Sequence, residues 1–210
     1  MITLSHIFKS FRGKQVLRDI SFEFSEGLHC VKGKNGVGKS TLIKVIAGVC
    51  ESDSGEVLLH GINLRTRATV AKRKLAYIPD SCPVYDFLSG KQFLDLVAQI
   101  KCCSVGATSL RLLDRFLLLE HLNTKIKDLS FGTKRKLMIA AASIGDPSII
   151  VADEPSNGLD EHSLSLVTEF LRTVAENGVV LFTSHDENYI AQCDPLIVDL
   201  VDGALVLRSA

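Results

Sequence analysis

The fold of this chain is decided by nine consecutive residues, Gly33-Lys34-Asn35-Gly36-Val37-Gly38-Lys39-Ser40-Thr41. They match G-x-x-x-x-G-K-[ST], the pattern of a loop whose backbone amides form a nest for phosphate oxygens at the start of a helix. The glycines permit positive φ angles and a close approach of the backbone to a ligand. Lys39 would supply positive charge to the β- and γ-phosphates, and the Ser40 hydroxyl would ligate Mg²⁺. All nine residues are therefore expected to bind a nucleotide.

The segments on both sides of this loop support the same interpretation. Leu28–Val31 is a short apolar run typical of a buried strand, and Leu42–Ala47 has the pattern of a helix core that Gly48 ends. A glycine-rich turn that contains a lysine by chance would need neither the strand nor the helix. We therefore expect an α/β fold with a phosphate-loop NTPase core, in which helices flank a mainly parallel sheet.

Two acidic residues follow another apolar strand. Ile149–Ala152 leads directly into Asp153 and Glu154. Buried strands of α/β proteins deliver functional groups at their carboxyl ends. Asp153 is expected to hold Mg²⁺ through its water shell, and Glu154 to orient or deprotonate an attacking water. A pair of solvated loop acids is the ordinary alternative, but it is a poor one in a chain that already carries a phosphate loop.

The remaining hydrophobic pattern places smaller units around this core. Ile2–Phe8 and Val16–Phe24 flank the turn Arg12-Gly13-Lys14 and predict an antiparallel β subdomain at the N-terminus. Leu196–Val206, around Asp202-Gly203, predicts a second hairpin. Further strands are expected at 56–60, 75–78 and 179–183, and a helix is expected at 161–176, ending near Gly178.

Residues from about 81 to 143 predict a mainly helical subdomain inserted into the α/β frame. Ser89 and Gln92 have the spacing of a capping box, and apolar residues follow at helical spacing up to Ile100. Leu110–Leu122 predicts another helical segment. With this insertion, residues 1–210 are expected to form a single domain.

The composition narrows the classes of partner. Lysine plus arginine equals aspartate plus glutamate at 24 each, so bulk charge gives no support for a nucleic-acid partner. The sequence contains no run of about 18 apolar residues, the length needed to span a bilayer. Its first residues lack the pattern of a secretory signal. The cysteines lack metal-ligand spacing, and we expect free thiols in a reducing cytoplasm. They are Cys30, Cys50, Cys82, Cys102, Cys103 and Cys193.

Between the two motifs lies Leu129-Ser130-Phe131-Gly132-Thr133, and with it the chain resembles the ATP-binding cassette (ABC) ATPase family from end to end. The family's signature sequence is usually LSGGQ, which Ser130 and Gly132 match and Phe131 and Thr133 do not. Ser130 is expected to cap a helix that begins near Thr133, whose outward amides would form an anion site. The resemblance implies that this site closes on the γ-phosphate of ATP held by a second cassette.

Three further segments match the family. Ser156-Asn157-Gly158-Leu159-Asp160 resembles the D-loop, which joins the sites of the two subunits. His185 resembles the switch histidine that senses the γ-phosphate, although a lone histidine after a strand is more often polar surface. Phe11 matches the aromatic residue that stacks on adenine, with a core phenylalanine as the competing interpretation. The resemblance implies catalytic roles for Glu154, His185 and Lys39.

Asp80 stands where the family usually has glutamine, after the expected strand 75–78. We expect its carboxylate to feel the Mg²⁺ and the γ-phosphate, directly or through water, and to act as a hinge residue. A simple turn after Pro79 is an equally good interpretation. Residues 81–90, with Tyr85 and Phe87 as apolar anchors, are expected to dock a permease helix. The segment resembles a bacterial exporter subgroup with separate permease chains.

The resemblance thus implies a subunit that binds and hydrolyses ATP with Mg²⁺ and energises transport, in the direction of export, through a separate membrane permease. The implied partners are a second cassette, in a homodimer, and the permease, which would hold the chain at the cytoplasmic face of the membrane. A non-transport ABC ATPase, such as a cofactor-assembly factor, is the alternative. An inactive ATP-binding subunit is disfavoured because Lys39, Asp153, Glu154 and His185 are all present.

Overall fold

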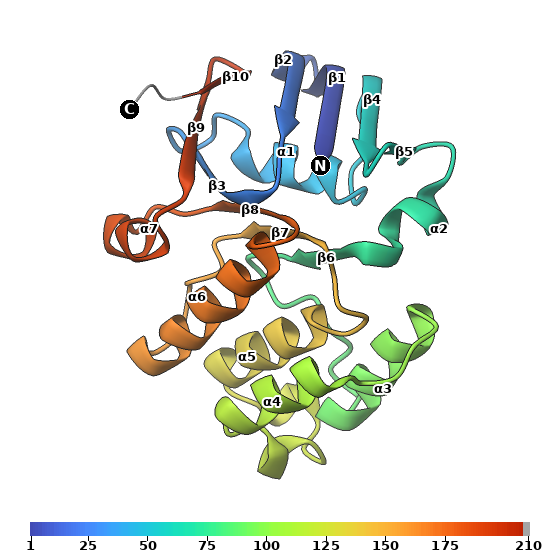
Figure 1. Ribbon diagram of the computed structural model, residues 1–210, viewed down its shortest axis with the longest axis vertical. Helices are drawn as coiled ribbons and strands as arrows, with labels where there is room; N and C mark the ends of the chain where they lie inside the picture. Colours follow the sequence, from blue (N-terminus) through green and yellow to red (C-terminus); the bar gives the residue numbers. More distant parts are fainter. Residues whose placement is uncertain (208–210) are drawn as a thin grey trace.

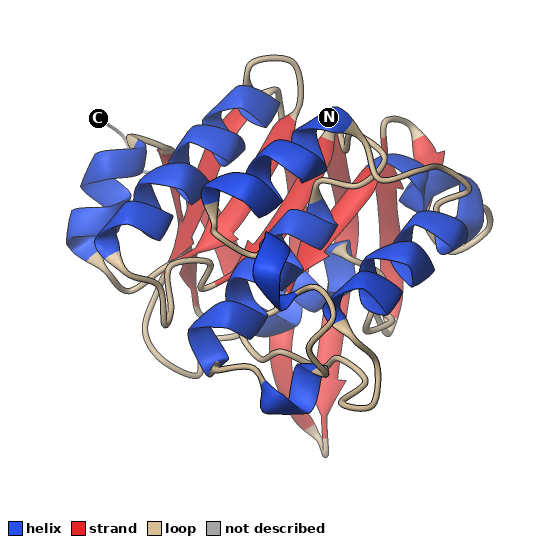
Figure 2. Cartoon of the chain, turned by 90° about the horizontal axis from the view of Figure 1, so that it is seen from below, coloured by secondary structure: helices blue, strands red, loops and turns tan. Residues whose placement is uncertain are grey.

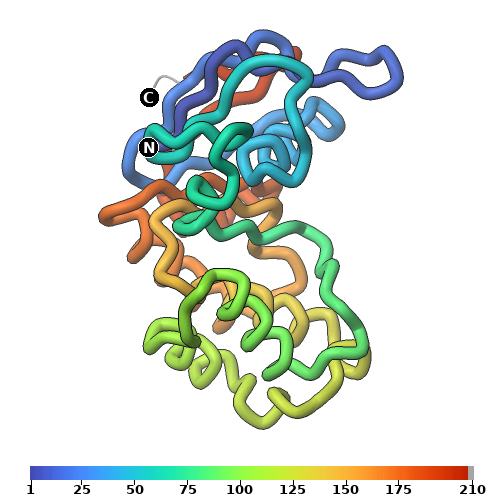
Figure 3. The backbone as a smooth tube through the Cα atoms, turned by 90° about the vertical axis from the view of Figure 1, so that its right-hand side faces the viewer, coloured from blue at the N-terminus to red at the C-terminus, as the bar shows by residue number. Residues whose placement is uncertain are grey.

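The computed structural model describes residues 1–207 and has two sheets at one end and a group of helices at the other (Figure 1). The two strands that the sequence predicts at the N-terminus are present, and with β4 and β5 they form a four-stranded antiparallel sheet in the order β2-β1-β4-β5. Its strands are β1 (Ile2–Phe11), β2 (Lys14–Phe24), β4 (Ser54–Leu59) and β5 (Ile62–Asn63). The β1–β2 turn projects from this sheet (Figure 3). Arg12 and Gly13 both have positive φ, as a two-residue hairpin turn requires.

The second sheet has six strands in the order β10-β9-β3-β8-β7-β6. All neighbours are parallel except β10, which forms the predicted terminal hairpin with β9. The strands are β3 (Gly27–Lys32), β6 (Leu75–Ile78), β7 (Ile149–Asp153), β8 (Val179–Thr183), β9 (Leu196–Val201) and β10 (Ala204–Leu207). The mainly parallel sheet of the predicted α/β fold is therefore confirmed.

The central strands are apolar along their whole length because both faces are covered. Every residue of β7 and β8 is buried, as expected for parallel strands between two layers. One face packs against α1 (Lys39–Ile46) and the N-terminal sheet, and the other against α5 (Phe131–Ala142) and α6 (Glu161–Ala175). Figure 2, which views the chain from below, shows the helices lying across the sheet. The parallel strands all deliver their carboxyl ends to the same edge.

The residues between β6 and β7 are helical or irregular, as the sequence predicts, whereas the limits of a separate subdomain remain a prediction. Two helices there are α3 (Gly90–Ile100) and α4 (Ala107–Arg115). Ser89 and Gln92 form the predicted capping box at α3. The single helical segment expected at Leu110–Leu122 is wrong: α4 ends at Arg115, and Leu117 has a φ of 56°, outside the helical range.

Short elements complete the described chain. Helix α7 (Glu187–Cys193), which the sequence reading missed, begins where Asp186 caps the amides of Asn188 and Tyr189. The other short helices are α2 (Ala68–Ala71), η1 (Lys72–Lys74), η2 (Leu119–His121) and η3 (Ile126–Asp128). The six cysteines are all free thiols, as expected. Within the described residues, no helix combines the length and the apolar character needed to span a bilayer.

Candidate functional site

A pocket of about 520 Å³ lies at the carboxyl edge of the central sheet and collects residues from five separate segments. It is lined by Val16, Asn35, Gly36, Gly38, Lys39, Ser40, Thr41, Asp80, Asp153, Glu154, Asn157 and His185. The phosphate loop, the two carboxylates and the histidine, which are far apart in the sequence, therefore share one cavity. Gly33, Lys34 and Val37 belong to the same loop without being among these lining residues.

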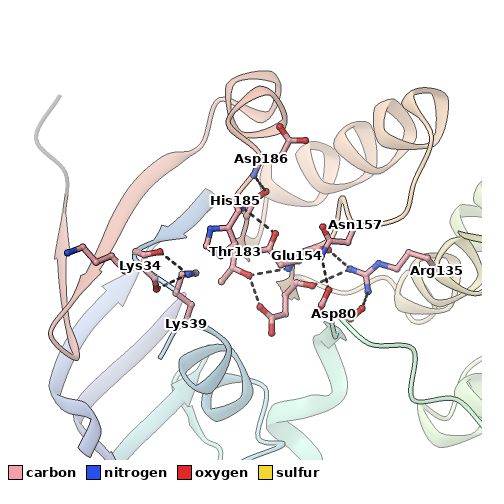
Figure 4. Close-up of polar contacts among 12 residues, drawn as sticks. Lys34, Lys39, Asp80, Arg135, Glu154, Asn157, Thr183, His185 and Asp186 are labelled. Atoms are coloured by element: carbon pink, nitrogen blue, oxygen red, sulfur yellow. Dashed lines mark hydrogen bonds and ion pairs between the residues drawn. The ribbon is translucent and has the colours of Figure 1, made fainter. Parts of the chain in front are cut away.

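The phosphate loop runs from the end of β3 into α1 with its lysine turned inward. Gly38 is the N-terminal cap of α1 and has a φ of 118°. A Cβ there would lie 2.7 Å from the Val16 side chain, so glycine is required by both conformation and space. The Lys39 ammonium donates to the carbonyl oxygens of Gly33 at 2.8 Å and Lys34 at 3.2 Å (Figure 4).

The buried position of Lys39 governs its electrostatics. Desolvation lowers the pKa of its ammonium, while the nearby charges of Glu154 and Asp153 oppose that shift. Ordinary lysine titrates near pH 10.4. The Lys39 ammonium, held by two carbonyl oxygens, is a suitable partner for a negatively charged phosphate. The backbone amides of a phosphate loop favour the same negative charge.

The end of β7 places the two carboxylates in different surroundings. Asp153 is buried, and one of its oxygens accepts a hydrogen bond of 2.7 Å from the Thr183 hydroxyl. The same hydroxyl accepts from the backbone amide of Glu154 at 3.1 Å. Thr183, at the end of β8 (Figure 4), thus bonds both to the Asp153 carboxylate and to the Glu154 amide and fixes the start of the loop after β7.

Glu154 and His185 face each other across the pocket. One Glu154 carboxylate oxygen accepts from the His185 backbone amide at 3.2 Å, and the other lies 3.5 Å from His185 Nε2. Burial raises the pKa of Glu154, and the amide and the imidazole of His185 oppose that shift. The backbone of Glu154 has a φ of 47°, an uncommon conformation for a residue with a side chain. Such a carboxylate, partly desolvated and held by an amide, has the character of a water-orienting group.

Asp80 follows β6 and lines the same pocket, as its position in the sequence led us to expect. Its carboxylate accepts a hydrogen bond of 2.9 Å from the Asn157 side chain. The D-loop segment is therefore tied to the residue at the expected hinge. The sequence alone does not show this bond, because the two residues are 77 positions apart.

A metal ion would find oxygen ligands in this pocket. Ser40, Asp153 and Asp80 present a hydroxyl and two carboxylates to it, and oxygen donors are the ligands that Mg²⁺ prefers. No group of three or more His, Cys, Asp or Glu residues suited to a metal is found in residues 1–207. The donor set fits an ion that takes much of its coordination from water and phosphate, and not one held in an all-protein cage.

The predicted signature lies at the start of α5 and outside the lining of this pocket. The Ser130 hydroxyl accepts from the Thr133 amide at 3.1 Å, so the predicted helix cap is confirmed, although the helix begins at Phe131. A Cβ on Gly132 would lie 3.0 Å from the Gly158 carbonyl oxygen. Ser130 and Phe131, at this helix terminus, are exposed.

Phe11 is placed at the end of β1 and is half exposed. The interpretation as a core phenylalanine is therefore wrong. The Lys9 ammonium lies 5.2 Å from the centre of its ring, a distance typical of a cation–π contact. Val16, from the neighbouring strand, is the hairpin residue that lines the pocket.

Arg135, which supports the site from behind, was not predicted from the sequence. Arg135 is fully buried in α5, and its guanidinium donates to the main-chain carbonyl oxygens of Asp80 and Glu154 (Figure 4). An arginine in a lysine-rich helix start, Lys134-Arg135-Lys136, would normally be assigned to the solvated face. The only signal available was its place on the same face as the apolar residues of the helix, three and four positions before Met138 and Ile139.

Comparison with protein families and curated proteins agrees with this geometry. Residues 17–157 match the family model described as ABC transporter. The chain is 31% identical over 204 residues to the Nod factor export ATP-binding protein I of Rhizobium etli, covering 94% of this chain and 64% of that protein. It is 29% identical over 221 residues to the ABC transporter ATP-binding protein NatA of Bacillus subtilis, covering 100% of this chain and 89% of the relative.

Solved structures show the same architecture. The fold superposes with a TM-score of 0.89 and 28% identity on a structure described as the ATP-binding subunit of an ABC transporter, covering 99% of this chain and 90% of that one. A dimeric structure of a bacterial ABC transporter cassette superposes with a TM-score of 0.87 and 23% identity over the whole of both chains. At that identity the second likeness shows the fold alone.

Proposed function

Because this chain belongs to the ABC transporter family and has the fold of its ATP-binding cassettes, we propose that it hydrolyses ATP to drive a membrane permease carried on a separate chain. One observation carries the proposal. A single pocket brings the phosphate-loop residues Lys39 and Ser40 together with Asp153, Glu154 and His185. This is the set of charges and donors that phosphoryl transfer to water requires.

The residues have distinct roles in this reaction. The amides of residues 33–41 and the Lys39 ammonium bind the phosphates of ATP. Glu154 orients the attacking water and accepts its proton as the oxygen bonds to the γ-phosphorus and the β–γ bridging bond breaks, leaving ADP and phosphate. His185, beside Glu154, contacts the γ-phosphate. Ser40, Asp153 and Asp80 would hold Mg²⁺, which when bound neutralises charge on the phosphates.

The groups that would bind adenine and those that would meet a second copy of the chain are exposed. Phe11 presents an exposed ring that can stack on adenine. Ser130 and Gly132 stand at an exposed helix N-terminus, where backbone amides favour an anion. The γ-phosphate held by a second copy is the proposed occupant, so that ATP is sandwiched in a homodimer, an arrangement supported by the dimeric cassette among the structural relatives.

The segment between β6 and α3 is the proposed dock for the permease. Tyr85 and Phe87 are exposed, and their ring centres lie 5.6 Å apart. Two adjacent aromatic rings in water are suitable anchors for a partner helix. Relatives named for Nod factor export and for linearmycin resistance support export as the direction. The permease would hold this chain at the cytoplasmic face of the membrane.

The proposal is tested by purifying the tagged chain with its partners from native membranes in mild detergent. We expect one copurified chain with several membrane spans that stimulates ATP hydrolysis when the two are reconstituted in vesicles. A Tyr85→Asp/Phe87→Asp variant, with its nucleotide pocket intact, is expected to hydrolyse ATP but to lose the partner. Recovery of a non-membrane cofactor-assembly enzyme in place of a permease would contradict the proposal.

A further inference from the structure

Arg135 is a charged residue in a place where an apolar side chain would be the simpler solution. It lies in the second turn of α5 and is completely shielded from solvent. Burial of a guanidinium is costly unless its donors are satisfied, and desolvation accordingly lowers its pKa. Arginine nevertheless stays protonated in proteins. The buried charge therefore requires partners, and they identify what the residue does.

The hydrogen-bond partners of the two terminal nitrogens of Arg135 are main-chain carbonyl groups from two strand exits, whereas its Nε has no hydrogen-bond partner among the described residues. One terminal nitrogen donates to the carbonyls of Pro79 and Asp80, the latter at 3.2 Å, just after β6. The other donates to the carbonyls of Asp153 at 3.2 Å and Glu154 at 2.6 Å, at the end of β7. The planar guanidinium thus spans the two neighbouring segments that carry the carboxylates of the pocket (Figure 4).

The contact with Glu154 matters most because of that residue's backbone. Its φ of 47° costs energy unless the surroundings hold it. The amide of Glu154 is held by the Thr183 hydroxyl at 3.1 Å and its carbonyl by Arg135 at 2.6 Å. The Glu154 carbonyl also accepts from the Asn157 amide at 3.2 Å. The residue is therefore fixed on both sides of its Cα, and of these contacts only the one with Arg135 comes from α5, the helix that Ser130 caps.

We propose that Arg135 is a positioning residue for ATP hydrolysis, which holds the backbone of Glu154 and Asp80 in register with the helix that begins at the signature. It is not among the residues that line the nucleotide pocket, and it acts through Glu154. A shift of this helix, when its N-terminus meets a ligand, would reach both carboxylates through one rigid side chain. The inference rests on the proposed hydrolysis at this site.

The test is Arg135→Lys, which keeps the charge and removes the fork that bonds both strand exits. A misplacement of about 1 Å in an active site can cost about a hundredfold in rate. We expect kcat of the full chain to fall about ten- to a hundredfold while KM for ATP stays within about twofold. Arg135→Gln, which is uncharged and has one donor nitrogen in place of the two terminal nitrogens of arginine, is expected to show the same split and serves if the lysine variant misfolds.

Two comparisons separate positioning from mere stability. Ser143→Ala removes the buried hydrogen bond of 2.8 Å that the Ser143 hydroxyl donates to the Ser109 hydroxyl at the far end of α5. It is expected to lower Tm without changing kcat. In single-turnover assays, Arg135→Lys is expected to lower the rate of ATP hydrolysis when introduced into the wild-type chain. It should not lower the rate further in the Glu154→Gln background, because Arg135 acts through Glu154.

A folded Arg135→Lys chain with wild-type kcat would overturn the inference, and so would an equal fractional loss in both backgrounds. An equal loss of kcat in Ser143→Ala would reduce the effect to stability and overturn it as well. A wild-type chain without any ATPase activity would contradict the proposed function itself, so the two failures are distinguishable.

Discussion

The side-chain amide of Asn157 donates to the carboxylate of Asp80 at 2.9 Å, which joins the exit of β6 to the loop after β7. Asp80 lies where the helical insertion begins, and Asn157 lies in the segment that resembles the D-loop. Both line the nucleotide pocket. The bond gives the hinge interpretation of Asp80 a physical basis, because a displacement of the insertion would be felt at the loop beside the signature.

Loss of this bond is expected to uncouple the cassette from its permease. Asp80→Ala and Asn157→Ala each remove one partner and should lower the ratio of permease-stimulated to basal ATP hydrolysis by a similar factor. The double variant should be no worse than either single variant, since both remove the same interaction. The measurement is ATPase activity with and without the permease in vesicles. A stimulation ratio at the wild-type level in both variants would reduce Asp80 to a turn residue.

At position 158, glycine is the only residue type that fits against the ring of Phe131. Its φ is 74°, and a Cβ there would lie 2.4 Å from the Phe131 ring. Gly158→Ala is expected to lower the free energy of unfolding by about 2–4 kcal/mol, from backbone strain and overpacking together. In a Phe131→Ala background only the strain should remain, about 1–2 kcal/mol.

Gly13→Ala is the matched control for this substitution. Gly13 has a φ of 80° but no atom within 4 Å of an added Cβ, so it reports the strain alone. Denaturant unfolding of the four variants measures the difference. Equal losses for Gly158→Ala in the presence and absence of the ring would show that Phe131 does not hold this segment.

Asp160 stabilises the start of α6 through its ionised carboxylate. It accepts from the Ser163 amide at 2.8 Å and from the Lys136 ammonium at 2.8 Å. The Lys136 bond, followed by the bonds from Ser163, lowers the pKa of Asp160 below its usual range. Asp160→Ala is expected to cost about 1 kcal/mol at pH 7, whereas Asp160→Ser keeps the cap and loses only the exposed ion pair.

The pH dependence follows from the direction of that shift. A lowered pKa in the folded state means that the stabilisation is complete above the unfolded value, about 3.9, and disappears as the pH falls below it. The difference in unfolding free energy between wild type and Asp160→Ala should therefore be smaller at pH 3.5 than at pH 7. A difference that grows on acidification would show that the carboxylate is not stabilised by its ionised form.

The parts of the fold that could be predicted are those with local signals. The phosphate loop, the strands around it and the capping box at Ser89 depend on residue types at short spacing, and the structure has each of them. Helix α7 was missed because its seven residues hold too few turns for a period to be recognised. The break at Leu117 was missed because leucine is a good helix former and its positive φ arises from its context.

The candidate site divides in the same way. Motifs predicted that Lys39, Asp153, Glu154 and His185 would share a pocket, and they do. Contacts between distant segments have no local signal, so neither the Asp80–Asn157 bond nor the packing of Phe131 on Gly158 could be predicted. Arg135 shows the same limit, because its burial depends on how α5 lies on the sheet.

Ser130→Arg tests the proposal that the signature meets a second copy. It places bulk and charge at the exposed start of α5, outside the lining of the pocket that contains the chain's own phosphate loop. The variant is expected to bind ATP through Lys39 but to remain monomeric in size-exclusion chromatography with Mg-ATP, when made in the Glu154→Gln background. Mixing it with Lys39→Ala chains leaves at most one intact composite site per dimer. Stable dimers of the arginine variant would rule out the head-to-tail arrangement.

The most direct test of the account is the rate of ATP hydrolysis by the Glu154→Gln chain, measured together with its size in Mg-ATP. Glutamine keeps the shape of the side chain but cannot accept a proton from water. We predict unchanged ATP binding, turnover reduced at least a hundredfold, on the order of the loss of a general base, and a persistent ATP-bound dimer. Hydrolysis at the wild-type rate would remove Glu154 from the reaction and contradict the mechanism.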